Sequence, residues 1–119
     1  MRITLMEIAH ARSGDKGDAS NIGLIAYTNS GYEVLKHCVS KEAVKEHFRL
    51  ICSGEVERFE VPNLKALNFI LHNSLGGGGS EIVKTDAQGK THGQGLLQME
   101  IDLPDGISLS DLLPESRVR

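Results

Sequence analysis

The residue types best suited to chemistry are concentrated in residues 10–21, whose sequence is HARSGDKGDASN. The glycines allow positive φ angles, so successive backbone N–H groups can point into one concavity and bind an anion. Arg12 offers a planar fork of donors and Lys16 a point charge, while the imidazole of His10 titrates near neutral pH. His10 is therefore a candidate catalytic acid or base. The candidate ligand-binding residues of the segment are Arg12, Ser13, Gly14, Asp15, Lys16, Gly17, Asp18 and Asn21.

The same composition also has a purely structural interpretation. Asp, Gly, Ser and Asn form tight turns without any ligand, and Asp15 or Asp18 can pair with Lys16 or Arg12. The segment lacks the GxxxxGK[ST] spacing of a nucleotide-binding loop and the alternating ligands of an EF-hand. The sequence leaves both interpretations open, as a functional loop and as a structural turn.

A second pair of polar residues, Asn68 and His72, lies four positions apart. On a helix this spacing places both side chains on one face, beside a stripe of leucines. Asn68 is a further candidate ligand-binding residue and His72 a second candidate catalytic residue, although a polar pair that satisfies itself at the edge of the core is the favoured interpretation. Histidine and cysteine spacings fit neither a zinc finger nor an HExxH helix, so we expect no metal site and no cofactor.

The elements that position these residues alternate between strands and helices. Strands are predicted at 2–8, 21–28, 55–61 and 97–103, with an optional one at 81–83, a loop at 11–20, and helices at 32–38, after the N-cap Ser40 and over 64–75. This order predicts an α+β two-layer sandwich of ferredoxin-like type, with a mostly antiparallel sheet and two main helices on one face. Residues 1–104 are expected to form the single domain and 105–119 a C-terminal tail.

Composition and charge exclude several classes of function. The chain has 119 residues, enough for one core, and its net charge of −3 gives no electrostatic footprint for nucleic acid or an anionic membrane. No apolar run approaches the ~18 residues that a membrane span requires, and Arg2 and Glu7 are incompatible with the apolar region of a signal peptide. Cys38 and Cys52 fit buried, reduced thiols, so we expect a cytoplasmic protein.

A series of motifs follows a recognisable order along the chain. They are HARSGDKGD at 10–18, SNI at 20–22, VKEHF at 44–48, GEVERF at 54–59, PNL at 62–64, ALNF at 66–69, LH at 71–72 and the glycines before Glu81. Together, over residues 8–101, they resemble the small C-terminal domain of the AtuA family of acyclic terpene utilisation proteins.

The resemblance implies a ferredoxin-like fold, which agrees with the order of elements above. In this family the domain usually follows a much larger N-terminal domain, so the chain resembles a free-standing version of the small domain. The family is associated with the breakdown of citronellol- and geraniol-like isoprenoids through their acyl-CoA derivatives. No set of catalytic residues carries over, and whether the chain is an enzyme stays open.

Three functions are compatible with these observations. The first is an accessory subunit or assembly domain for a large AtuA-like protein in isoprenoid acyl-CoA catabolism. The alternative is a homo-oligomeric small-molecule binding protein or enzyme, which binds a carboxylate or acyl-CoA through residues 10–21. In the third, the chain is a scaffold that binds no ligand.

Overall fold

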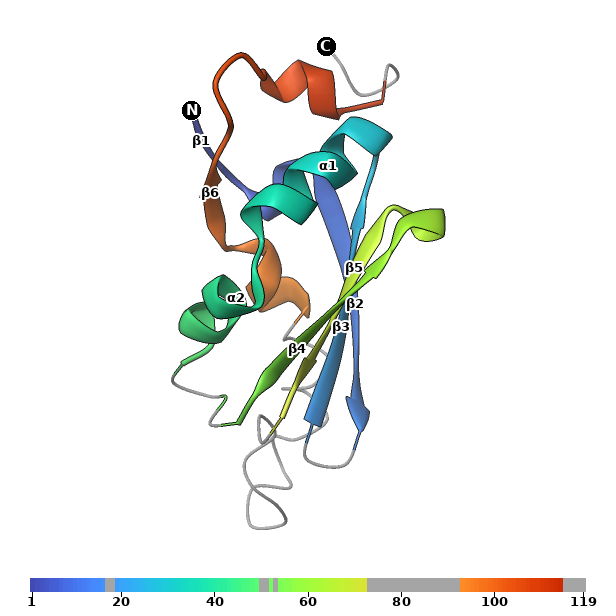
Figure 1. Ribbon diagram of the computed structural model, residues 1–119, viewed down its shortest axis with the longest axis vertical. Helices are drawn as coiled ribbons and strands as arrows, with labels where there is room; N and C mark the ends of the chain where they lie inside the picture. The colour runs from blue at the N-terminus through green and yellow to red at the C-terminus, as the bar shows by residue number, and fades with distance from the viewer. Residues whose placement is uncertain (17–18, 50–51, 53, 73–92, 115–119) are drawn as a thin grey trace.

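The computed structural model describes residues 1–16, 19–49, 52, 54–72 and 93–114, with residues 15 and 16 as backbone alone. Its main sheet is antiparallel, and its strands lie in the order β2-β3-β5-β4 (Figure 1). These strands are β2 (Ala9–Lys16), β3 (Ala19–Ala26), β4 (Val56–Val61) and β5 (Ala66–Leu71). A smaller antiparallel sheet pairs β1 (Arg2–Thr4) with β6 (Glu100–Asp102).

Helices α1 (Asn29–Cys38) and α2 (Lys41–His47) lie on one face of the main sheet, together with β1 and β6 (Figure 1). Three 3-10 helices complete the described elements: η1 (Leu5–Glu7), η2 (Pro62–Leu64) and η4 (Leu109–Leu112). The predicted α+β architecture, with a mostly antiparallel sheet and helices on one face, is confirmed. No helix in the described part of the chain is long and apolar enough to cross a membrane.

The loop predicted over residues 11–20 is wrong, because most of it forms the hairpin of β2 and β3. The two strands pair from Ala9 opposite Ala26 to Lys16 opposite Ala19. The side chains of β2 that face the helices are small, so the strand lacks the large apolar residues by which a strand is usually recognised. Its turn-forming composition is overridden by eight residues of pairing with β3.

The helix predicted over residues 64–75 is also wrong. Leu67 and Leu71 are fully buried as expected, but Phe69 between them is equally buried. Every second residue of strand β5 from Leu67 to Leu71 therefore faces the core. A spacing of four residues fits one helical turn and two strand repeats equally well, so the leucines alone did not distinguish them. Leu64 lies in η2 with 63% of its surface exposed, and Leu75 is outside the described residues.

The predicted helix starts and strand ends agree with the structure in part. Ser40 caps α2 as predicted, since its Oγ accepts a hydrogen bond from Ala43 N at 3.0 Å. Helix α1 begins three residues earlier than the pattern suggested, because Thr28 caps it by accepting from Gly31 N at 2.9 Å. Residues 97–103 alternate between buried and exposed as predicted, but strand pairing is confined to β6 and residues 93–97 are helical. Strand 2–8 is likewise divided between β1 and η1.

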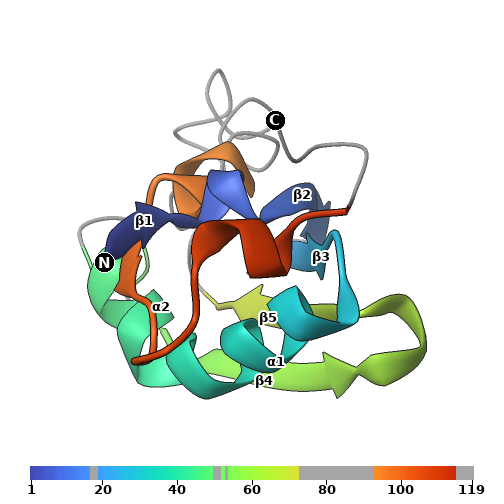
Figure 2. The same ribbon diagram turned by 90° about the horizontal axis from the view of Figure 1, so that it is seen from above.

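The core lies between the helices and the inner face of the main sheet, the face that α1 and α2 cover. Its fully buried side chains include Ile22, Leu24, Leu35, Val44, Leu67 and Phe69. The segment after Pro104 returns to this core, because Leu112 is fully buried and its carbonyl accepts a hydrogen bond from Thr28 Oγ1 at 2.8 Å. Figure 2 shows η4 beside α1.

Arg58 joins the helical layer to the edge of the sheet. Its Nε donates to Val39 O and its Nη2 to Lys36 O, both at 2.9 Å. These carbonyls lie at the C-terminus of α1, where backbone acceptors lack intrahelical partners and the helix dipole favours a cation. With its side chain 19% exposed, the guanidinium is shielded enough for these bonds to matter.

We expect Arg58→Met to lower the free energy of unfolding by about 2–3 kcal/mol. The two hydrogen bonds to the partly buried carbonyls are lost, and so is the more exposed pairing of Arg58 Nη1 with Glu60 Oε2 at 3.1 Å. Urea denaturation monitored by circular dichroism measures the change. The control is Arg49→Met, because Arg49 pairs with Glu46 on the surface with 63% of its side chain exposed. That substitution should cost less than about 1 kcal/mol. Equal losses for both variants would contradict the role of Arg58.

The docking of η4 should depend on pH through Asp111. Its carboxylate accepts hydrogen bonds from the backbone N–H and the hydroxyl of Ser108, and these bonds lower its pKa. The cap therefore contributes stability above the ordinary carboxyl range, near pH 4, and loses it as the pH falls through the lowered folded pKa. The Ser108 amide resonance should titrate with a midpoint below that range and should not titrate in Asp111→Asn. A midpoint at or above the ordinary value would contradict the capping interaction.

Candidate functional site

The strand register arranges the side chains of the outer face, the face of the main sheet opposite α1 and α2, into rows. Each row crosses β2, β3, β5 and β4 in that order. The rows are His10–Ile25–Ala66–Val61, then Arg12–Gly23–Asn68–Phe59, then Gly14–Asn21–Ile70–Glu57. Side chains alternate along a strand, so the residues between the buried positions of each strand face outward. The polar residues among them therefore lie together on the outer face.

The structure brings several predicted site residues to this outer face. Besides those in the rows, His72 continues the alternation of Asn68 and Ile70 beyond the end of β5. The outer-face candidates are therefore His10, Arg12, Gly14, Asn21, Asn68 and His72. Asn68 and His72 share a face as predicted, although on a strand rather than on a helix.

The remaining predicted residues do not join this group as side chains of the outer face. Ser13 faces the helical layer, where its Oγ accepts from Gly93 N at 3.2 Å. Asp15 and Lys16 end β2, and the structure describes their backbone alone. Gly17 and Asp18 lie outside the described residues.

The two candidate catalytic histidines lie far apart on the outer face. His10 is in the row of Ala66, and His72 is six residues further along β5. At about 3.4 Å per residue, this places them roughly 20 Å apart along the strand direction. His10 instead stacks on Tyr27, with 5.6 Å between ring centroids. One ligand of ordinary size therefore does not contact both imidazoles.

A hollow of about 400 Å³ lies over the middle of the outer face. It forms where Gly23 has no side chain between Arg12 on β2 and Asn68 on β5. A Cβ atom at Gly23 would lie 3.9 Å from Asn68 Oδ1 and 3.9 Å from Ile25 Cδ1, so a methyl group fits and a larger side chain would fill the space. Glycine within a strand often marks a place where another group approaches the backbone.

Three polar side chains beside this hollow, those of Arg12, Asn21 and Asn68, have unused hydrogen-bonding groups within the described part of the chain. Within the described part of the chain, the Arg12 guanidinium and the Asn68 amide make no hydrogen bond or ion pair. Asn21 Oδ1 is buried and has no partner among the described residues. Buried polar atoms in folded proteins are normally satisfied, so this oxygen is available to a ligand or partner. Arg12 is exposed and Asn68 is half-buried, so both can be reached from solvent. The guanidinium suits a carboxylate, which it can bind through two parallel hydrogen bonds.

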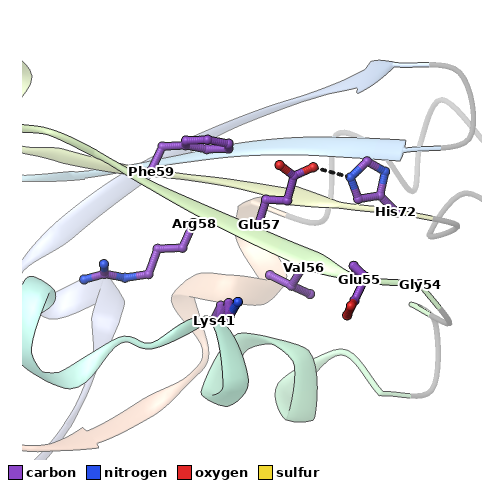
Figure 3. Close-up of a pocket in the computed structure, with 8 residues that line it drawn as sticks. All are labelled: Lys41, Gly54, Glu55, Val56, Glu57, Arg58, Phe59 and His72. Carbon is purple, nitrogen blue, oxygen red and sulfur yellow. Dashed lines mark hydrogen bonds and ion pairs between the residues drawn. The ribbon is translucent and has the colours of Figure 1, made fainter.

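A second depression, of about 720 Å³, surrounds the edge strand β4. Figure 3 shows Glu57, Phe59 and His72 on one side of the strand and Val56 and Lys41 on the other. The lining residues lie on both faces of one edge strand, so they cannot all contact one ligand. This depression is therefore not a single binding site. The hollow over Gly23 is smaller, but polar groups converge on it.

His72 and Glu57 form a hydrogen bond on this edge, with 2.5 Å between Nε2 and Oε2 (Figure 3). About half of each side chain is exposed to solvent. Such a pair holds the imidazole in one orientation but contributes little stability. The interaction connects the end of β5 to β4, and its chemistry is that of a histidine oriented by a carboxylate.

Sequence reasoning missed three residues of the outer face: Gly23, Glu57 and Phe59. Gly23 lay within a predicted strand, where a glycine signals close approach. Glu57 and Phe59 alternate in the correctly predicted strand 55–61. Their pairing with residues of β5 depends on the strand register, for which the sequence carried no local signal.

Among the described residues, neither the two thiols nor the side chains that could ligate a metal form a second cluster. Burial raises the pKa of Cys52 and of Cys38, so both free thiols stay protonated. Cys52 Sγ donates to the carbonyl of His72 at 3.3 Å. Within the described residues, no group of three or more His, Cys, Asp or Glu side chains could hold a metal ion.

These features define an α+β domain with one sheet face covered by helices and the other presenting polar groups around a hollow. The family model described as the AtuA ferredoxin-like domain matches residues 3–102. The chain belongs to this family. Neither the curated proteins nor the solved structures include a significant match to it.

At Gly54, just before β4, the backbone lies in contact with the backbone of His72. Its N–H donates to His72 O at 3.1 Å. A Cβ atom at this position would lie 2.7 Å from the same oxygen and 2.9 Å from His72 Cβ. The close approach of two backbones therefore requires glycine here.

We expect Gly54→Ala to destabilise the fold by about 1–3 kcal/mol, because the new methyl group collides with backbone that must shift. It should also displace His72 and weaken its pairing with Glu57, which the imidazole NMR resonances report. The matched control is Gly14→Ala, since a Cβ there meets nothing within 4 Å. An unchanged stability and an unchanged His72 spectrum in Gly54→Ala would contradict the argument.

Proposed function

We propose that this chain is an accessory or assembly domain for a large AtuA-like protein, and that it docks through the outer face of its main sheet. The observation that supports this function is that no described element covers the outer face, although it carries large apolar side chains. The family of the chain is the second support, because its small domain usually accompanies a large one. The proposal includes a role in isoprenoid acyl-CoA catabolism in the cytoplasm.

The apolar part of this face lies at β4 and η2. Phe59 is 45% exposed and Leu64 is 63% exposed. Val61 lies between them on the same side and is half-buried. Arg12 on β2 and the hydrogen-bonded pair of Glu57 and His72 surround this apolar area with polar and charged groups. An apolar centre with a polar rim is the usual anatomy of an interface between proteins.

A second candidate function is supported by a different observation. Around one hollow, Arg12, Asn21 and Asn68 present polar groups that have no partner among the described residues. This arrangement favours a small-molecule binding protein, active as a homo-oligomer, with a carboxylate or an acyl-CoA as its ligand. The two functions are compatible, because a ligand in the hollow would lie beneath a docked partner.

The docking function predicts that Phe59→Asp combined with Leu64→Asp prevents assembly. Co-expression with the large AtuA-like protein encoded nearest to this chain, followed by light scattering of the purified complex, measures the stoichiometry. The double variant should reduce the affinity by at least tenfold, because charges replace apolar side chains at the centre of the interface. Its melting temperature should change little, since both residues are exposed.

The matched control is Met6→Asp. Met6 is 49% exposed but lies in η1, outside the strands that form the outer face. This variant should assemble like the native chain. If the native chain stays alone in the presence of the large protein, or if Met6→Asp and the double variant lose affinity equally, docking through the outer face is wrong.

A further inference from the structure

The hollow over Gly23 is asymmetric, with a cationic end and an apolar end. Arg12 stands at the β2 side, while Phe59 and Val61 of β4 and Leu64 of η2 line the opposite side. Three strand spacings separate β2 from β4, which corresponds to about 14 Å between the backbones. A ligand that lies across the strands therefore meets a positive charge at one end and hydrocarbon at the other.

The cationic end suits a single carboxylate group. One guanidinium presents paired N–H donors that match the two oxygens of a carboxylate. Arg12 has no internal acceptor within the described residues. The neighbouring groups that line the hollow, Asn21 and Asn68, are neutral amides. They can complete the hydrogen bonds of one anionic group without adding charge.

The apolar end sets the length of the ligand. Phe59 and Leu64 are exposed enough to gain from burial, at roughly 25 cal/mol for each Å² of apolar surface removed from water. Gly23 on β3 and the strand β4 are two strand spacings apart, about 10 Å, which fits a hydrocarbon chain of about six to eight carbons.

We propose that the hollow over Gly23 binds a free monocarboxylic acid with a medium-length apolar chain, with Arg12 as the anchor of the carboxylate and Phe59 and Leu64 as the wall for the chain. This inference rests on the second candidate function and does not require the docking partner. It differs from a nest of backbone N–H groups in a loop, because the described part of residues 10–21 is a strand hairpin. The anion is instead recognised by one side chain.

The test is an NMR titration of the isolated full chain with octanoate as the probe. Octanoate should shift the amide resonances of Gly23, Asn68 and Phe59, and saturate. Octanol should bind at least tenfold more weakly, because it cannot accept the paired donors of Arg12. Octanoyl-CoA tests the other source of negative charge. Saturable binding of octanoyl-CoA without binding of octanoate would overturn the proposal, because the site would then recognise the phosphates of the CoA.

The variants separate the two ends of the hollow. Arg12→Gln should weaken octanoate binding at least tenfold, while Arg49→Gln, on a surface far from the hollow, should leave it unchanged. Gly23→Leu should abolish binding because its side chain fills the hollow, whereas Gly23→Ala should retain it. Unchanged affinity in Arg12→Gln would overturn the proposal. Because Arg12 lies on the surface, Arg12→Gln tests the proposal even if Gly23→Leu fails to fold. Loss of octanoate binding has no bearing on docking, which the co-expression experiment measures separately.

Discussion

Strand β3 pairs with β2 on one side and with β5 on the other, and its register decides which side chains meet the helices. Ile22 and Leu24 are fully buried on the inner face, while Asn21, Gly23 and Ile25 face outward. A shift of one residue would move every side chain to the opposite face. It would expose two large apolar residues and bury an amide, so core packing holds the register. The composition of the outer face follows from this constraint.

The outer face can therefore carry groups that a core would not tolerate. A glycine at the centre of a strand has no side chain to pack against its neighbours. An arginine without a counter-ion contributes no ion pair to the stability of the fold. Gly23 and Arg12 occupy adjacent positions in one row, where their combined effect is a hollow with a charge at its edge. The docking and the ligand binding proposed above would both use this face. A partner on the apolar part would narrow the entrance to the hollow and would shield Arg12 from water, which strengthens its attraction for an anion.

The parts of the fold that were predicted from sequence are those with local causes. Ser40 caps a helix with its own side chain, and strand β4 alternates and ends at a proline. Strand β2 was missed because its inward residues are small, and the pairing that stabilises it comes from β3. Asn68 and His72 were predicted to share one face of a helix, and they share one face of the sheet instead. Residues four apart lie on the same side in both elements, because four residues make about one helical turn and two strand repeats. Cross-strand neighbours such as Gly23 and Phe59 could not be predicted, because they are brought together by register.

Strand β4 carries Arg58 between Glu57 and Phe59, so neighbouring residues of one strand point to opposite sides of the sheet. The inward guanidinium holds the last carbonyls of α1, and the outward side chains belong to the surface proposed for docking. A molecule that immobilises Phe59 also restricts the backbone from which Arg58 reaches the helix. Occupancy of the outer face and order at the end of α1 are thus linked across the thickness of the sheet. By reciprocity, a substitution that loosens the end of the helix would lower affinity on the opposite surface without touching the bound molecule.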